Sequence, residues 1–266
     1  MKYLWTVVAL FFFFLGNAQS LKLMTYNIRL DIESDGENKW SNRNEFLTSQ
    51  IQFYEPDIFG IQEAKPNQVI DIASALSHYN FIGIGRDGVN QGESSNIYYK
   101  KDRFKLLQNS TFWLSETPDT ISKGWDAAFN RVCTYALFKD LKTKTDFWVF
   151  NTHLDHMGEL AKTNGIQLIL SKIASLNTKK YPVIFMGDFN ATPEEYTIKE
   201  FLEKEMGFVR LKPSNPISTH QVAGMVDHIF FFPASRLVAY DCWIEASDLA
   251  HQVSDHLPVV AEITIK

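Results

Sequence analysis

An Asp and an Asn stand together at the end of one of the most apolar segments of the sequence, "VIFMGDFN" at residues 183–190. Side chains two positions apart in an extended chain point to the same side, so Asp188 and Asn190 are expected to face one spot. Other apolar segments also border side chains that could act on a metal ion or a phosphate group, namely Asn27, Glu63, His153, Asp255 and His256. Strand ends at one edge of a sheet converge in space, which favours a single site built from these residues.

The chemistry that these residue types could perform together is phosphate ester hydrolysis. Glu63 and Asp255 are hard oxygen donors, with Asn27 and Asp188 as close candidates, and this set suits Mg²⁺ or Mn²⁺ better than zinc. The two histidines could donate protons or hydrogen bonds to phosphoryl oxygens. A metal ion among carboxylates neutralises charge that develops at phosphorus and helps to generate hydroxide. Taken singly, each residue also fits a turn, a helix cap or a solvated position, so only their convergence indicates catalysis.

Other common catalytic frameworks lack support in the sequence. It contains no GxSxG nucleophile elbow, no HExxH helix and no Walker phosphate loop. The formal net charge of -5 argues against tight, non-specific binding of duplex DNA, which depends on many Lys and Arg contacts to phosphates. This charge still permits a phosphate substrate that a metal ion handles locally.

The elements that must position these residues are mostly strands. We predict ten of them, at residues 21–28, 57–62, 81–85, 96–100, 132–138, 147–154, 182–188, 226–232, 237–244 and 258–265. Many are continuously apolar, as expected for strands that are covered on both faces. No linker, repeat or low-complexity tract interrupts residues 21–266, which we interpret as one catalytic domain.

Helical patterns lie between some of these strands. A 3.6-residue period runs from Phe46 to Tyr54, with Asn42 and Glu45 as an expected N-terminal cap pair. A second amphipathic helix is expected at residues 166–176, and weaker helical patterns occupy residues 66–77 and 194–205. Ten strands with few helices exceed a doubly wound sheet, so the pattern predicts two packed sheets with helices outside.

Residues 1–20 have the layout of a cleaved signal peptide, with an early Lys, an apolar run and then small residues. The apolar run from Leu4 to Leu15 is too short to span a bilayer, although an uncleaved anchor is the alternative. We therefore expect an exported protein, periplasmic or extracellular, without stable membrane insertion. Cys133 and Cys242 lie in strand-like segments and are interpreted as small buried residues, although export would permit a disulfide.

Several motifs together resemble one known family. "TYNIR", "PDIFGIQEA", "GESSNIYYK", "FNTHLDH", "PVIFMGDFN", "VDHIFF" and "SDHLPV" occur in this order over nearly all of residues 21–266. They resemble the endonuclease/exonuclease/phosphatase superfamily, which has the deoxyribonuclease-I-like fold. "FWLSETP" and "GWDAAFNR" are similar to its exported bacterial branch. The resemblance implies an α/β, four-layer αββα sandwich of two mixed sheets, and a phosphoesterase that uses Mg²⁺ or Mn²⁺.

The resemblance also implies a role for each site residue. Asn27, Glu63 and Asp255 are expected to bind the metal ion, with Glu63 as the principal ligand. Asp188 is expected to activate the attacking water. Asn190 and His256 are expected to bind the phosphate, and Asp227 is expected to orient His256. The general acid is expected to be His153, with Glu93 as its carboxylate partner, and Arg131 is expected to contact a phosphate oxygen.

Four further residues are expected near the substrate. Asp155 and His156 would line the pocket, or else would cap a helix that begins near Met157. Trp125 and Phe129 lie in a long connection and could form an aromatic wall that stacks on a base or a sugar.

The function implied is an exported metal-dependent phosphoesterase that most readily fits a phosphodiester and in-line attack by an activated water. The alternatives are a phosphomonoesterase acting on a small sugar or lipid head-group phosphate, and a catalytically silent binding protein with the same fold. A monomer is expected, and the substrate is open between nucleic acid and a small phosphoester.

Overall fold

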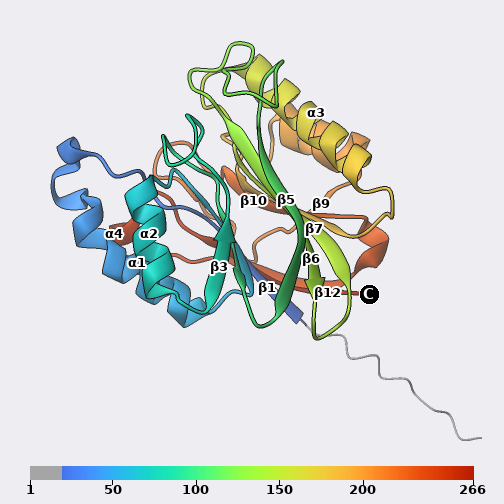
Figure 1. Ribbon diagram of the computed structural model, residues 1–266, viewed down its shortest axis with the longest axis horizontal. Coiled ribbons are helices and arrows are strands. Elements are labelled where there is room, and N and C mark those ends of the chain that lie inside the picture. Colours follow the sequence, from blue (N-terminus) through green and yellow to red (C-terminus); the bar gives the residue numbers. More distant parts are fainter. Residues whose placement is uncertain (1–19) are drawn as a thin grey trace, which may run out of the picture.

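The computed structural model describes residues 20–266, so the predicted signal peptide lies outside the described residues except for Ser20. Two six-stranded sheets pack face to face, with helices on both outer sides (Figure 1). Sheet 1 has the order β11-β12-β1-β2-β4-β3 and sheet 2 the order β5-β6-β7-β8-β10-β9. Only β1–β2 and β7–β8 pair in parallel in these sheets of the described chain. The predicted architecture of two packed mixed sheets is confirmed.

The strands of sheet 1 are β1 (Ser20–Asn27), β2 (Ile58–Gln62), β3 (Tyr79–Ile82), β4 (Ile97–Lys100), β11 (Leu237–Ile244) and β12 (Val259–Ile265). Those of sheet 2 are β5 (Phe104–Trp113), β6 (Val132–Asp140), β7 (Asp146–His153), β8 (Val183–Asp188), β9 (Val209–Arg210) and β10 (Asp227–Phe232). Short 3-10 helices η1 (Glu33–Asn38) and η3 (Ala234–Arg236) complete the connections.

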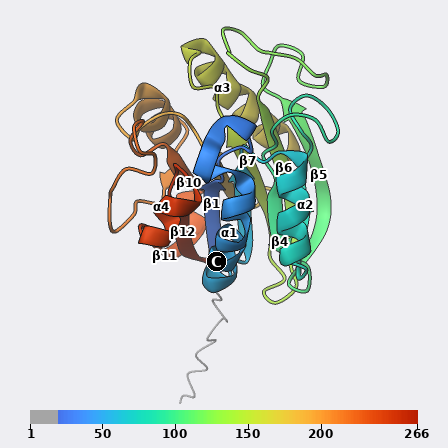
Figure 2. The same ribbon diagram turned by 90° about the vertical axis from the view of Figure 1, so that its left-hand side faces the viewer.

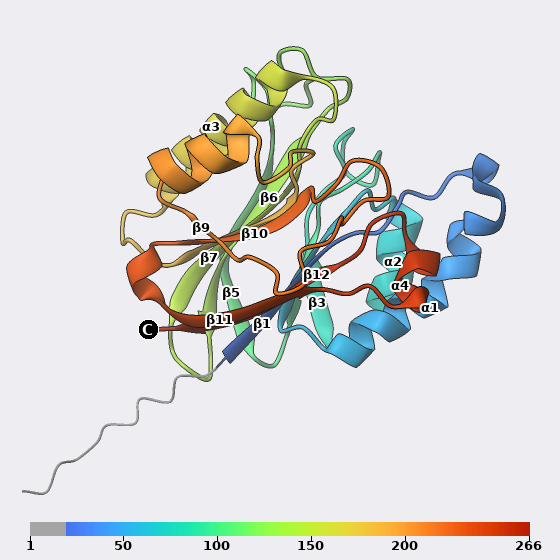
Figure 3. The ribbon, with the colours of Figure 1, turned by 180° about the vertical axis from the view of Figure 1, so that it is seen from behind.

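The helices form the two outer layers. α1 (Trp40–Tyr54), α2 (Pro66–Ala75) and α4 (Asp248–Val253) lie against sheet 1, the side that Figure 2 presents to the viewer. α3 (Glu159–Leu176) and the π-helical segment η2 (Thr197–Glu205) lie on the opposite side, against sheet 2 (Figure 3). Three apolar clusters fill the spaces between the layers, one between the sheets and one under each helical layer.

The β8 strand shows why the apolar sequence segments lack alternation. Ile184 and Met186 pack into the cluster between the sheets, whereas Val183 and Phe185 pack into the cluster under α3. Both faces of the strand are therefore buried, and every position except the chemistry-bearing end is apolar.

Two strands that the sequence pattern did not predict, β5 and β9, form the edges of sheet 2. Most of the middle of β5 is exposed, so its sequence is polar and gives no strand signal. β3 ends at Ile82, earlier than predicted, because Gly83 takes a positive φ of 131°.

Some predicted helix boundaries were wrong. α1 begins at Trp40, so Asn42 lies inside its first turn and donates a side-chain hydrogen bond to the Glu37 carbonyl instead of acting as the cap. The predicted helix at residues 194–205 is the π-helical η2, which begins three residues later, at Thr197.

A buried polar contact joins the two sheets directly beneath the strand ends. Asn151 of β7 donates to the Ile61 and Asn96 carbonyls of sheet 1 at 3.0 and 2.9 Å. Its Oδ1 accepts a hydrogen bond from Gln62 Nε2 at 2.7 Å. These bonds lock the end of β2, and hence Glu63, to the sheet that holds His153.

Cys133 and Cys242 are buried and unpaired in the described chain, in agreement with their interpretation as small buried residues. None of the helices within residues 20–266 combines the length and apolar character that a bilayer crossing requires.

Candidate active site

A cavity of about 670 Å³ opens at one edge of the paired sheets. The parallel strands β1 and β2, and likewise β7 and β8, end at this edge. β10 runs antiparallel to β8, which places its first residue, Asp227, opposite Asp188. The lining consists of Leu30, Glu63, Arg86, Glu93, Phe129, Arg131, His153, His156, Asp188, Asn190, Glu195, His220, Ala223, Val226, Asp255 and His256.

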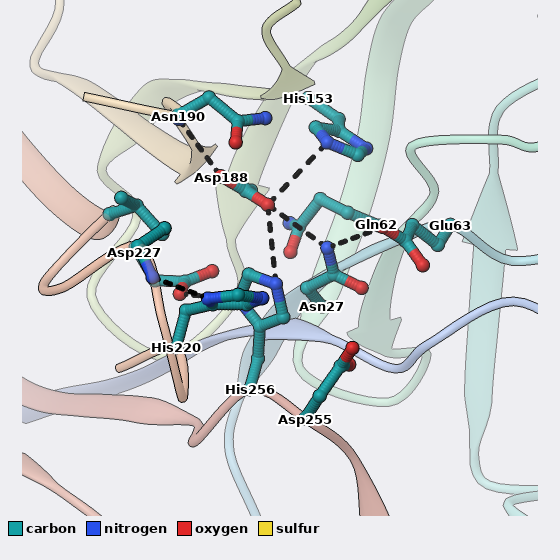
Figure 4. Close-up of polar contacts among 12 residues, drawn as sticks. Asn27, Gln62, Glu63, His153, Asp188, Asn190, His220, Asp227, Asp255 and His256 are labelled. Carbon is teal, nitrogen blue, oxygen red and sulfur yellow. Dashed lines mark hydrogen bonds and ion pairs between the residues drawn. The ribbon is translucent and has the colours of Figure 1, made fainter. Parts of the chain in front are cut away.

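Asp188 is at the centre of the polar contacts, as Figure 4 shows. Its Oδ2 accepts a hydrogen bond from Asn27 Nδ2 at 3.0 Å and lies 3.5 Å from His153 Nε2 and 3.7 Å from His256 Nε2. Its Oδ1 accepts the backbone N–H of Asn190 at 2.9 Å. Burial and the neighbouring Asp227 raise the pKa of Asp188, which makes it a stronger base than an exposed carboxylate.

His256 is a charged imidazole at this site. Its Nδ1 lies 2.8 Å from Asp227 Oδ2, within hydrogen-bond distance. Burial alone would lower the pKa of His256, but the charge of Asp227, the hydrogen bond to it and the charge of Asp188 raise it to about 10. The imidazolium can thus offer Nε2–H to a phosphate oxygen at neutral pH.

His153 differs from His256 in its charge state. Burial, assisted by the positive charges of Arg131 and His256, lowers the pKa of His153 well below its ordinary value. A neutral imidazole can donate a hydrogen bond to a phosphate oxygen, and the general-acid role expected of His153 stays a prediction.

The sequence predicted Glu93 as the carboxylate partner of His153, but in the structure Glu93 pairs with Arg86 instead. Its carboxylate accepts from both terminal nitrogens of Arg86 at 2.8 Å. Burial raises the pKa of Glu93 while the Arg86 charge opposes that rise. Glu93 therefore lines the cavity, and the Arg86 guanidinium of the same loop balances its charge.

Glu63 is held in an unusual backbone conformation, with φ of 64°. Left-handed backbone at a non-glycine residue costs about 1–2 kcal/mol, and such residues cluster at functional sites. Its Oε1 accepts from Asn27 Nδ2 at 3.1 Å, and its Oε2 accepts the Leu30 N–H at 3.0 Å. Asp255 is partly exposed and lines the same cavity, with its Oδ2 3.8 Å from Arg29 Nη1.

The donor set fits a divalent cation. The lining contains the carboxylates of Glu63, Glu93, Asp188, Glu195 and Asp255, against the guanidiniums of Arg86 and Arg131 and the imidazolium of His256. Asp188, Asp227 and His256 also offer ligand atoms within 4.8 Å of one another. Of these groups, Glu63 and Asp255 are better suited to a cation than His256, whose Nδ1 is engaged with Asp227.

Arg131 is almost fully buried but still faces the cavity, at 5% exposure. Its Nε lies 3.3 Å from Asp155 Oδ2 and its Nη2 lies 3.3 Å from His156 Nδ1. Its Nη1 has no hydrogen-bond partner among the described residues. A buried donor without a partner is expensive, so this atom is suited to a substrate oxygen.

Asp155 does not line the cavity. Its carboxylate accepts the backbone N–H groups of Ala128, Met157 and Gly158, and it is 1% exposed. It holds Arg131 and the loop that precedes α3, which begins at Glu159. His156 does line the cavity, as expected.

The expected aromatic wall is only partly present. Trp125 is half-buried and does not reach the cavity, whereas Phe129 lines it at 48% exposure. The Arg86 guanidinium lies 4.7 Å from the Phe129 ring centroid, and His156 stacks against the same ring.

Sequence reasoning missed His220, Arg86 and Glu195, which also line the cavity. None of them ends an apolar strand, because all three lie in loops. The strand-end signal that found the other residues could not identify them.

Comparison with known proteins agrees with this geometry. The profile of the Endonuclease/Exonuclease/phosphatase family matches residues 24–256. An uncharacterised protein of Acanthamoeba polyphaga mimivirus is 26% identical over 84% of this chain and 91% of its own length. A Bacteroides vulgatus endonuclease/exonuclease/phosphatase superimposes with a TM-score of 0.86 and 32% identity, covering 93% of this chain and all of the other. A Bacteroides thetaiotaomicron mannosyl-6-phosphatase gives 0.81 and 32%, covering 92% and 100%.

Proposed function

The chain belongs to the endonuclease/exonuclease/phosphatase family of phosphoester-cleaving enzymes, and from that premise we propose that it hydrolyses a phosphate ester with a bound divalent cation. The observation that supports this most directly is Asp188, which is buried between a charged His256, a His153 and the metal-side Asn27. A carboxylate with a raised pKa in that position can take a proton from water beside a phosphate.

Each residue then has a defined task. Glu63 and Asp255, with Asn27, would hold Mg²⁺ or Mn²⁺, which when bound neutralises charge at phosphorus and acidifies water. Asp188 accepts the proton of the attacking water. His256, Asn190 and His153 donate hydrogen bonds to phosphoryl oxygens. The water attacks in line with the leaving group, which inverts the configuration at phosphorus.

Among substrates we favour a small phosphomonoester, such as a sugar phosphate, over a phosphodiester. A monoester phosphate has one more terminal oxygen, and the unpartnered Nη1 of Arg131 supplies one more donor. The lining, with five carboxylates against two guanidiniums, offers no continuous basic path for a polynucleotide. The similarity to the mannosyl-6-phosphatase supports the same choice.

A phosphodiester is the second candidate, because the Nε2 atoms of His153 and His256 both lie within 3.7 Å of Asp188 Oδ2. The two imidazoles could each donate a hydrogen bond to a non-bridging oxygen, and a diester has two such oxygens.

Hydrolysis of p-nitrophenyl phosphate and bis-p-nitrophenyl phosphate tests both the enzyme and the ester type. We expect activity with Mg²⁺ or Mn²⁺, loss of activity with EDTA, and a loss of about 10³-fold or more in Asp188→Asn and in His256→Ala. Equal rates in all of these conditions would mean a silent binding protein instead. A panel of hexose phosphates, nucleotides, DNA, RNA and sphingomyelin would then identify the substrate.

We also propose that the enzyme is a monomer that acts outside the cytoplasm after removal of residues 1–20. Cell fractionation with N-terminal sequencing tests export, and light scattering of the purified protein tests the oligomeric state. Cytoplasmic full-length protein, or a stable dimer, would contradict these two proposals respectively.

A further inference from the structure

The loop that precedes β10 places an unassigned histidine at the cavity. Thr219 and His220 both donate their backbone N–H to the Gly224 carbonyl, at 3.1 and 3.0 Å, which closes a tight turn. The Thr219 hydroxyl accepts the N–H groups of Val226 and Asp227 at 2.9 and 3.1 Å. The turn is thereby tied to the start of β10, where Asp227 orients His256.

Hydrogen bonds fix the tautomer of the His220 side chain. Its Nδ1 accepts the backbone N–H groups of Val222 at 3.0 Å and Ala223 at 2.7 Å. A ring nitrogen that accepts two N–H groups holds no hydrogen of its own. The imidazole hydrogen therefore sits on Nε2.

The ring of His220 lines the cavity beside His256. The two ring centroids are 4.6 Å apart, in an edge-on arrangement, and Figure 4 shows the two histidines side by side. Within residues 20–266 no group accepts a hydrogen bond from His220 Nε2. The turn thus presents one oriented, neutral N–H donor next to the charged imidazole that meets the phosphate.

We propose that His220 is a substrate-binding residue whose Nε2–H donates to a non-bridging oxygen of the substrate's phosphate. This rests on the proposed function, since the ligand is the phosphate ester. A neutral donor suits this position, because a second imidazolium 4.6 Å from His256 would be repelled by it. The two amides at Nδ1 exclude that state.

Two substitutions separate the donor from the turn. Asparagine can keep an acceptor near the position of Nδ1, so His220→Asn preserves the turn but removes the donor at the cavity. Glutamine places an amide N–H near the position of Nε2, so His220→Gln retains a donor. Val222→Ala is the matched control, because the Val222 side chain is 90% exposed in the same turn.

The measurements are the affinity for inorganic phosphate by calorimetry in Mg²⁺ buffer, kcat and KM with p-nitrophenyl phosphate, and the melting temperature. We expect His220→Asn to weaken phosphate affinity by about tenfold or more at an unchanged melting temperature, His220→Gln to recover part of that loss, and the control to match wild type.

The outcomes distinguish the two proposals. Wild-type phosphate affinity in His220→Asn would overturn the role of His220 while leaving the enzyme intact. Equal losses in His220→Asn and His220→Gln, accompanied by lower melting temperatures, would show a structural role only and would also overturn it. A wild-type protein that neither binds phosphate nor hydrolyses any ester would refute the proposed function and this inference together.

Discussion

At the scale of single residues, the pair formed by Asp227 and His256 sets the charge and the orientation of one imidazole. Asp227 is 1% exposed and lies 2.8 Å from His256 Nδ1. We expect Asp227→Asn to lower kcat by about 10²–10⁴-fold, because an amide neither holds the charge nor fixes the ring as the carboxylate does. Steady-state kinetics with p-nitrophenyl phosphate measures this loss.

The folded state of Asp227→Asn must be checked in parallel, by its melting temperature. A correctly folded variant that loses less than about tenfold in kcat, near 1.4 kcal/mol, would mean that His256 does not need Asp227.

Asp155 predicts a pH dependence of stability. Burial alone would raise its pKa, but the N–H groups of Ala128, Gly158 and Met157 and the charge of Arg131 outweigh it and hold the pKa well below its usual range. Because the folded pKa is depressed, this stabilisation is full above the unfolded pKa of about 3.9 and is lost as pH falls toward the folded value.

We therefore expect Asp155→Asn to be less stable than wild type at pH 7, by about 2 kcal/mol, and to lose less stability on acidification below about pH 5. Urea unfolding followed by circular dichroism at several pH values measures both effects. Parallel stability curves for the two proteins over the whole acidic range would contradict the assignment.

Sequence alone predicted that residues next to buried strands, such as Asp188, Glu63 and His256, share one place, and they line one cavity because strand ends meet at one edge. It did not predict side-chain partners within loops. Glu93 pairs with Arg86 and not with His153, since the loop conformation sets those distances, whereas Asp155 accepts backbone N–H groups before α3, close to the capping role that was its predicted alternative. His220 gave no signal for the same reason.

At the scale of secondary structure elements, the close approach of β7 and β8 requires Gly187. Its φ is 148°, and a Cβ atom there would lie 2.0 Å from the Thr152 carbonyl oxygen. Gly187→Ala must push β8 away from β7, so we expect a loss of at least about 3 kcal/mol in the free energy of unfolding. Activity should fall as well, because Asp188 is the next residue.

The matched control for this prediction is Gly207→Ala. Gly207 also has a positive φ, of 70°, but a Cβ atom there would have nothing within 4 Å. The control should lose only about 1 kcal/mol, the cost of left-handed backbone. Similar urea midpoints for both variants would show that the contact with Thr152 relaxes without strain.

The burial of each strand explains which strands the sequence predicted. β8 is buried on both faces, and its apolar run is plain in the sequence. β5 is an edge strand whose exposed middle accepts polar residues, so hydrophobicity does not mark it. Only its pairing with β6 makes it a strand.

At the scale of the whole molecule, two sheets are joined so that both contribute to one cavity. Glu63 and Asp255 come from segments flanking sheet 1, whereas His153 and Asp188 come from sheet 2. Asn151 donates a hydrogen bond to the Ile61 carbonyl and accepts one from Gln62, and these bonds hold the two sheets in register. The groups that the two sheets contribute to the cavity therefore keep their relative positions only while the sheets stay packed.

The accumulation of carboxylates at this junction predicts a stability effect of metal binding. Glu63, Glu93, Asp188, Glu195 and Asp255 line one cavity, and a bound divalent cation would relieve their repulsion in the folded state only. At a concentration about 100 times Kd, such a ligand adds about 2.7 kcal/mol of stability. For a chain of this size that corresponds to a rise of roughly 5–10 °C in melting temperature.

Differential scanning calorimetry with Mg²⁺, Mn²⁺ or EDTA measures that rise, and Glu63→Gln is the variant that tests its location. Glutamine keeps the shape and can still accept the Leu30 N–H, but it lacks the charge that binds the cation. We expect the variant to melt near wild type in EDTA and to gain much less from either cation. An equal gain in both proteins would place the cation away from Glu63, and no gain in wild type would argue against a metal site in this cavity.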